Sequence, residues 1–273
     1  MVRFFIFLFL FFISGCEETP LELNNEFDPS NPDHVPPNIE SIYTTPGMVN
    51  GIINANSVTI EYEGNIEDLE FQYQLDGAEW SEWDSESRVT LNFLDEGSHI
   101  FLVQCRYLSG EIEVNPDTLQ FEIDAIDGPA LRIFPLFTEI PIGQEFTIEV
   151  MAENLDPVAA MELVLTYDIN HLNIIEDNID YGEFFSGCGT PIMIKYLVKN
   201  DYSGIGTIII DIGCYGGVLE TVSGYGSIIS IKATADMTGF TDIEFEYNDI
   251  LLRGANNEPV ELEEAWDGLV EIQ

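Results

Sequence analysis

The side chains that could do chemistry in this chain are three histidines, four cysteines and a large excess of carboxylates. The histidines, His34, His99 and His171, are far apart in the sequence, and no serine or cysteine lies in a Gly-x-Ser-x-Gly elbow. Carboxylates are so numerous that a glycosidase pair could be drawn almost anywhere, and the sequence gives no separation between any two of them. An organised catalytic site is therefore not indicated, and we expect no enzyme activity.

Acid-rich loops are candidate calcium-binding sites, because calcium takes about six to eight oxygen ligands. The densest groups are Asp84 with Glu86, and the carboxylates between Glu258 and Asp267. Neither follows the Asp-x-Asp-x-Asp-Gly pattern of a calcium loop. We interpret these acids as solvated turns, and we predict no metal site and no cofactor.

The charge balance limits the partners of the chain. Its 273 residues hold 50 Asp and Glu against 8 Lys and Arg, which gives a net charge of −42. Nucleic-acid binding needs basic residues along a phosphate track and is excluded, and anionic lipid would not attract the chain by charge. Because 45% of the residues are hydrophobic, folded domains with sizeable cores are expected.

The first residues have the pattern of a signal peptide, with Arg3 before an apolar run from Phe4 to Ile13. The run is much shorter than the roughly 20 residues of a spanning helix. The tetrapeptide that ends at Cys16 resembles the bacterial lipobox, which implies that residues 1–15 are removed and Cys16 is acylated. The acidic pair Glu17 and Glu18 looks like a surface-export signal of some Gram-negative lipoproteins. We expect an outer-membrane or cell-surface protein that contacts the membrane only through its lipid anchor.

The remaining chain divides into a tether and two β-domains. Residues 16–37 are rich in Pro, Asn and acids and predict an extended tether. Residues 38–126 and 129–273 contain short alternating segments bounded by turn residues, and no segment has a convincing helical period. We predict an all-β fold with two β-sandwich domains that meet at Asp127-Gly128-Pro129. The strands predicted from alternation are 58–62, 71–75, 89–93, 100–105 and 119–123, then 131–134, 146–150, 161–167, 192–198, 208–212, 228–233, 243–247 and 269–272.

Three cysteines follow Cys16. Cys105 lies in an apolar strand and is expected to be a buried thiol. If strands 192–198 and 208–212 form a hairpin about Tyr202-Ser203-Gly204, Cys188 and Cys214 meet at its open end. A disulfide between these two is predicted, as is reasonable in an exported protein.

The first domain resembles the three-tyrosine-motif and fibronectin type III-like modules of bacterial surface proteins. The pattern is carried by Phe71–Trp83, with Leu-Asp-Gly and Trp-Ser, and by Leu94–Val103. This resemblance implies an immunoglobulin-like spacer. Trp80 and Trp83 then pack in the core or on a hairpin, or alternatively form a platform for sugar rings.

The second domain resembles a cohesin, the dockerin-binding module of cellulosome-type scaffolds, whose fold is related to that of cellulose-binding modules. The resemblance implies a nine-stranded, jelly-roll-like sandwich. It runs in order through most of the domain, in the segments Pro141–Val150, Val158–Asp168, Tyr181–Gly187, Gly226–Ala233, Asn256–Val260 and Asp267–Val270.

A cohesin implies a non-catalytic adhesion or scaffold protein whose partner is an exported protein that carries a dockerin. The family binds this partner on a sheet containing the strand 161–167 and its neighbours. Alternation places Glu162, Val164 and Thr166 on the outer face of that strand, and the match adds Asp168. Which phase of strand 192–198 faces outward stays open. The alternative function is polysaccharide capture, which would need a row of exposed aromatic rings, and Tyr215, Tyr225, Phe240 and Trp266 are scattered candidates.

Overall fold

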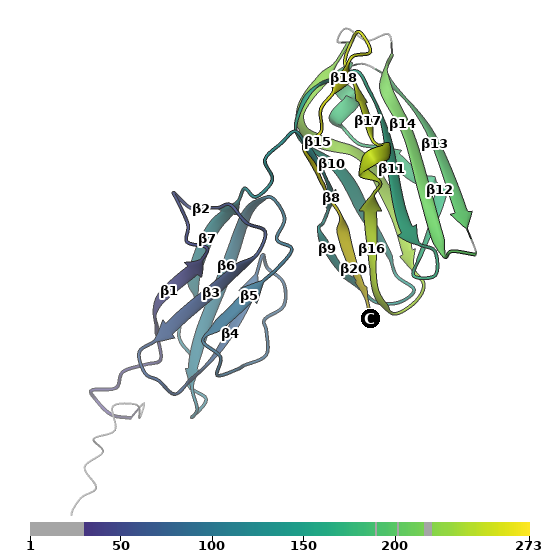
Figure 1. Ribbon diagram of the computed structural model, residues 1–273. Coiled ribbons are helices and arrows are strands. Elements are labelled where there is room, and N and C mark those ends of the chain that lie inside the picture. The colour runs from purple at the N-terminus through teal and green to yellow at the C-terminus, as the bar shows by residue number, and fades with distance from the viewer. Residues whose placement is uncertain (1–29, 189, 201, 216–219) are drawn as a thin grey trace, which may run out of the picture.

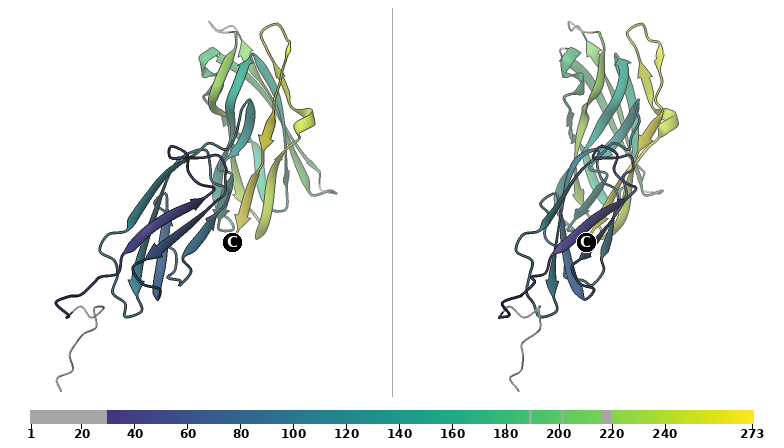
Figure 2. Two further views of the ribbon diagram at one scale, coloured as in Figure 1. Left: turned by 60° about the vertical axis from the view of Figure 1, so that its left-hand side comes forward. Right: turned by 90° about the vertical axis from the view of Figure 1, so that its left-hand side faces the viewer.

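The computed structural model describes residues 30–188, 190–200, 202–215 and 220–273, and shows two β-domains that follow one another along the chain (Figures 1 and 2). The predicted all-β fold is confirmed: within those ranges the only helical elements are the short 3-10 turns η1 (Phe184–Cys188) and η2 (Tyr247–Asp249). The predicted signal peptide, Cys16 and most of the tether lie outside the described residues. No helix in the described part of the chain has the length and hydropathy needed to cross a membrane.

The first domain packs a three-stranded sheet, in the order β1-β3-β5, against a four-stranded sheet in the order β2-β7-β6-β4. Alternation produces the core: on β6 the side chains of Phe101, Val103 and Cys105 are fully buried while their neighbours face outward. Cys105 is thus the buried free thiol that was predicted. The strands are β1 (Ile39–Thr45), β2 (Ile52–Ile53), β3 (Val58–Gly64), β4 (Leu69–Leu75), β5 (Arg88–Leu91), β6 (Gly97–Tyr107) and β7 (Asp117–Ile123).

Trp83 has a packing role in this domain. The guanidinium of Arg106 lies over its ring, 4.4 Å from the centroid, and Arg106 is held there by Glu70, whose Oε2 accepts from Nε at 2.6 Å. One face of the indole is therefore covered by the protein itself. This arrangement favours packing over a sugar platform at Trp83.

The second domain is a sandwich of a five-stranded sheet, in the order β12-β15-β10-β8-β19, and a larger sheet in the order β13-β14-β11-β16-β20-β9 with β17 and β18 beside β11. The described residues form thirteen strands here, where nine were expected. They are β8 (Ala130–Phe134), β9 (Phe137–Ile140), β10 (Glu145–Val158), β11 (Ala160–Asp168), β12 (Leu172–Tyr181), β13 (Thr190–Asn200), β14 (Ile205–Tyr215), β15 (Val222–Ala235), β16 (Gly239–Phe245), β17 (Leu251–Arg253), β18 (Pro259–Val260), β19 (Glu264–Trp266) and β20 (Gly268–Ile272).

The extra strands have two sources. The first strand of the domain divides at Pro135 into β8 and β9, which pair with strands of opposite sheets. The segment before the final strand adds three short strands, β17, β18 and β19, which pair with β11, with each other or with β8. A strand of two or three residues carries too little alternation to be found in the sequence.

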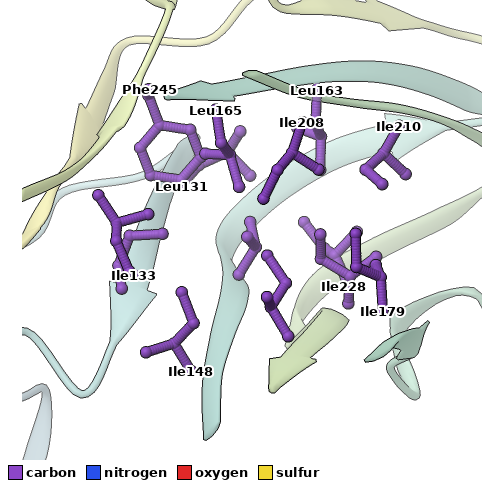
Figure 3. Packing of buried hydrophobic residues seen from close by; sticks show 14 of the residues in the cluster. Leu131, Ile133, Ile148, Leu163, Leu165, Ile179, Ile208, Ile210, Ile228 and Phe245 are labelled. Carbon is purple, nitrogen blue, oxygen red and sulfur yellow. The ribbon is translucent and has the colours of Figure 1, made fainter. Parts of the chain in front are cut away.

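The core of the second domain lies between its two sheets. Figure 3 shows Leu163, Leu165, Ile208 and Ile210 of β11 and β14 facing apolar side chains of the other sheet, among them Ile133, Ile148 and Ile228. Each fully buried Leu or Ile contributes about 1.5–3 kcal/mol to folding. Because the inner residues of β11 and most of those of β14 are large and apolar, the outer residues of the same strands are fixed in register and position on the opposite face.

The junction between the domains is tied by charged and polar contacts. The carboxylate of Asp95, in the loop before β6, accepts from the backbone N–H of Leu136 at 2.9 Å and lies 3.6 Å from Nη1 of Arg132. Arg132 is buried and also donates to Glu153 at 2.6 Å. The rings of Phe93 and Phe137 stack beside this pair of contacts, with centroids 5.9 Å apart.

Candidate partner-binding face

The four strands expected to form a binding sheet lie side by side, in the order β13-β14-β11-β16. In Figure 1, β13 and β14 form the edge of the second domain that is farthest from the first domain. The strands pair antiparallel with an unbroken register along β13, β14 and β11, so that outward side chains from the three strands fall in rows. These rows are Ile192, Gly213 and Ala160; Ile194, Asp211 and Glu162; Tyr196, Ile209 and Val164; and Val198, Thr207 and Thr166.

The structure settles the phase of β13. Its outward residues are Ile192, Ile194, Tyr196 and Val198, each between 47% and 53% exposed. Burial alternates along the strand, so Met193, Lys195 and Leu197 point toward the interior. An apolar stripe therefore runs along the outer face of this last strand of the sheet, and it continues onto Ile209 of β14.

The inward phase is held by contacts between the two sheets. Nζ of Lys195 reaches across to β12 and donates to the carbonyl of Ile179 at 2.6 Å. The backbone N–H of Met193 donates to the hydroxyl of Tyr181 at 2.9 Å, and Lys199 donates to Asn173 at 3.1 Å. Because Lys195 finds its hydrogen-bond partner between the two sheets, its neighbours Ile194 and Tyr196 face outward to solvent.

The structure brings Glu162, Val164 and Thr166 together on the outer face of β11, where the sequence placed them. Val164 is in the centre of the face but only 7% exposed, and its carbonyl accepts from Glu246 at 2.9 Å. It can contribute to the floor of a contact but little to its surface. Thr166 lies between Thr207 and Glu244 in the register and is half-buried.

Asp168 lies at the far end of the strand and is engaged in its own turn. Its carboxylate accepts from the backbone N–H and the side-chain amide of Asn170, at 2.7 and 2.8 Å, and contacts Nδ1 of His171 at 3.0 Å. Burial acts to raise the pKa of Asp168, but the hydrogen bonds from Asn170 and His171 outweigh it and hold the pKa below its ordinary value. Asp168 therefore orders the end of β11, and its oxygens are already occupied.

The face also carries carboxylates, on β14, β11 and β16. Glu162 stands directly across from Asp211, and burial together with the charge of Asp211 raises the pKa of Glu162. Burial and the charges of Asp267 and Asp242 likewise raise the pKa of Glu244 on β16. Like charges placed opposite one another destabilise a sheet, so a cation at this position would be stabilising.

The aromatic residues considered for a sugar platform do not form a row. Tyr215 ends β14, Phe240 is on β16, and Tyr225 and Trp266 are on β15 and β19 in the other sheet. Tyr215, Tyr225 and Phe240 are strongly exposed, and Trp266 is half-buried. Their distribution over four strands in two sheets does not favour a flat glycan site.

Two further predictions concern the cysteines and metals. The structure contains the predicted disulfide between Cys188 and Cys214, whose Cα atoms are 5.4 Å apart, at the open end of the β13–β14 hairpin. Within the residues that the structure describes, no cluster of three or more His, Cys, Asp or Glu side chains is arranged to hold a metal ion.

The sequence left undecided whether Ile192, Ile194 and Tyr196 face outward, and it did not single out Val198 or Ile209, although these five residues dominate the face. The signal was present but ambiguous. Strand 192–198 is apolar in both phases, with Lys195 as its only charged side chain. A rule that charged residues face solvent would have chosen the wrong phase.

Comparison with solved structures shows that the chain is similar to cohesins. A non-cellulosomal cohesin from the hyperthermophilic archaeon Archaeoglobus fulgidus is 19% identical, with a TM-score of 0.41, and the match covers 53% of this chain and 90% of that one. A type I cohesin–dockerin complex from Clostridium thermocellum matches at 16% identity and a TM-score of 0.43, over 53% of this chain and 99% of the other. The sixth cohesin of scaffoldin B from Acetivibrio cellulolyticus, in complex with a dockerin, is 15% identical with a TM-score of 0.43. The match covers 54% of this chain and 100% of that one.

No family model matches the chain, and no curated protein sequence matches it.

Proposed function

We propose that the second domain is a protein-binding module whose partner docks on the β13-β14-β11-β16 face, and that the partner is an exported protein with a dockerin-like domain. The observation that carries this proposal is the exposed apolar stripe Ile192, Ile194, Tyr196 and Val198. Large apolar side chains gathered on one solvent-facing strand are typical of interaction sites. The order of cohesin-like sequence segments supports the dockerin-like class of the partner.

The chemistry of the face also supports a non-catalytic role. Three of the four rows across β13, β14 and β11 contain only uncharged side chains, and the carboxylates of Glu162 and Asp211 share the remaining row. A partner with an apolar ridge would remove the stripe from water, and every 100 Å² of apolar surface so buried contributes roughly 2.5 kcal/mol before the costs of association. The first domain then acts as a spacer between this face and the point of attachment.

The test is capture of exported proteins from the source organism, with the full chain as bait, beside an array of polysaccharides. Tyr196→Asp places an unpaired charge in the stripe and should weaken capture by at least about tenfold. Tyr43→Asp is the matched control, because Tyr43 lies on β1 of the first domain and is 55% exposed against 53% for Tyr196. Equal capture by both variants, or binding to a polysaccharide in place of a protein, would contradict the proposal.

Attachment to the cell is the second part of the proposal. We propose that the chain is lipidated at Cys16 and held at the cell surface or outer membrane by this anchor alone. The lipobox-like sequence before Cys16 supports it. Labelling with a fatty-acid analogue should mark the wild type and not Cys16→Ala, and equal labelling of both would reject the anchor.

A further inference from the structure

A shallow pocket interrupts the proposed binding face near one end of β11 and β14. It has a volume of about 360 Å³ and lies where two small residues, Gly213 and Ala160, are neighbours in the register. Larger side chains stand on both sides, with Ile192 and Ile194 of β13 on one side and Leu251 and Arg253 of β17 on the other. The pocket exists because the strands place glycine and alanine between rows of larger residues.

The walls of the pocket are mainly apolar. Ile192, Ile194 and Leu251 are each between 44% and 48% exposed, so their side chains are available to a ligand. The long aliphatic part of Arg253 can extend the apolar wall while its guanidinium stays in water. A branched aliphatic side chain of the size of leucine matches such a site in chemistry.

The charges at the rim favour a cation next to that apolar group. Glu162 and Asp211 face one another across β11 and β14, and both line the pocket. Asp249, whose charge also raises the pKa of Glu162, adds to the negative side, and Arg253 is the basic residue among the lining side chains. Two lining carboxylates against one guanidinium leave the rim negative, in a chain whose net charge is −42.

We infer that this pocket is the anchor point of the binding face: it takes a branched apolar side chain of the partner protein, and a Lys or Arg of the partner lies beside it between Glu162 and Asp211. The inference rests on the proposed function and names the partner's chemistry at one position. An anchor in a pocket, surrounded by weaker contacts, is how binding energy is commonly distributed over protein interfaces.

The inference can be tested without the partner, by using 3-methylbutylammonium as a probe. This ion joins the branched end of a leucine side chain to a positive charge. Added to the full chain with labelled isoleucine methyl groups, it should shift the NMR signals of Ile192 and Ile194 most. Because rim charges are partly exposed, it should bind about threefold or more tightly than 3-methylbutanoate, with 3-methylbutanol between them.

Two variants locate the site. Ala160→Leu fills the pocket and should abolish the shifts, whereas Thr207→Leu adds a similar side chain three rows away on the same face and should leave them unchanged. Glu162→Gln should remove most of the preference for the ammonium ion and leave binding of the alcohol intact. The methyl spectrum of each variant reports whether it is folded.

The outcomes separate this inference from the proposed function. Shifts centred on other residues, or equal binding of the carboxylate and the ammonium ion, would contradict the inference that this pocket binds the partner's side chain. So would capture of a protein partner that is sensitive to Tyr196→Asp but indifferent to Ala160→Leu. Failure to capture any protein, with the probe still bound at the pocket, would instead count against the proposed function.

Discussion

Loss of the disulfide between Cys188 and Cys214 should destabilise the second domain by about 3.5 kcal/mol. The two cysteines are 26 residues apart in the sequence. Cross-linking such a loop removes about 12 cal/mol/K of entropy from the unfolded chain, from the relation −2.1 − 1.5R ln n, which amounts to about 3.5 kcal/mol at 25 °C. This is a large part of the roughly 5–15 kcal/mol that stabilises a typical domain.

Urea unfolding can measure this loss in one domain at a time. Trp266 is in the second domain, whereas Trp80 and Trp83 are both in the first. In a Trp80→Phe/Trp83→Phe background, tryptophan fluorescence therefore reports the second domain alone. The double variant Cys188→Ala/Cys214→Ala and the dithiothreitol-reduced parent should both show the decrease. The slope of free energy against urea should rise, because the unfolded chain without the cross-link is less compact and exposes more surface.

The first domain is the internal control for this experiment. Its cysteine, Cys105, is a free thiol, so reduction should not alter the unfolding of that domain. A loss below about 1 kcal/mol in the second domain would refute the entropic reasoning. An equal loss in both domains would show that reduction acts on the chain by another route.

Three further predictions concern the first domain and the junction. Burial raises the pKa of Glu113 above its ordinary value of 4.5, although its Oε1 accepts from the backbone N–H of Ile39 at 2.9 Å. The folded state therefore favours the protonated carboxyl, and the stability linked to this form is complete below pH 4.5. That stability is lost as pH rises through the raised pKa, so the first domain should become less stable over this range. Glu113→Gln should flatten this dependence in urea unfolding followed at several pH values, and an unchanged slope would contradict it. Asp95→Ala leaves the backbone N–H of Leu136 without its acceptor and should lower the stability of the junction by about 1–3 kcal/mol. Proteolysis between the domains should then be faster in Asp95→Ala than in the control variant Glu139→Ala.

The sequence predicted strands that either alternate or form an apolar run, and it missed several whose pattern is irregular. Strand β6 was predicted from its apolar run Ile100 to Cys105, and in the structure burial alternates along it from His99 to Tyr107. Strand β1 was missed because its residues, Ile39–Thr45, do not alternate cleanly between apolar and polar. Strand β12 is absent from the strands predicted from alternation, because its buried residues change phase between Ile174 and Ile179, where the register shifts.

The candidate face could be placed in part. The parity of β11 gave Glu162, Val164 and Thr166, because its inner residues are uniformly large and apolar. The exposure of Val164 could not be read from its own strand, since it depends on Ile209 and on the segment at Glu246. Contacts made by residues distant in the sequence decide such properties, and the junction between Asp95 and Leu136 was hidden for the same reason.

The lysines on the inner side of β13 bear on how copies of this chain behave toward one another. An edge strand with an apolar outer face is a ready template for the addition of a strand from another molecule, and such edge strands commonly aggregate. Lys195 and Lys199 both donate to β12, and inward-pointing charges on a terminal strand work against pairing with a second copy. A net charge of −42 adds repulsion between identical molecules. The edge strand β13 thus combines an exposed apolar stripe with charges that oppose its pairing with a second copy of the chain.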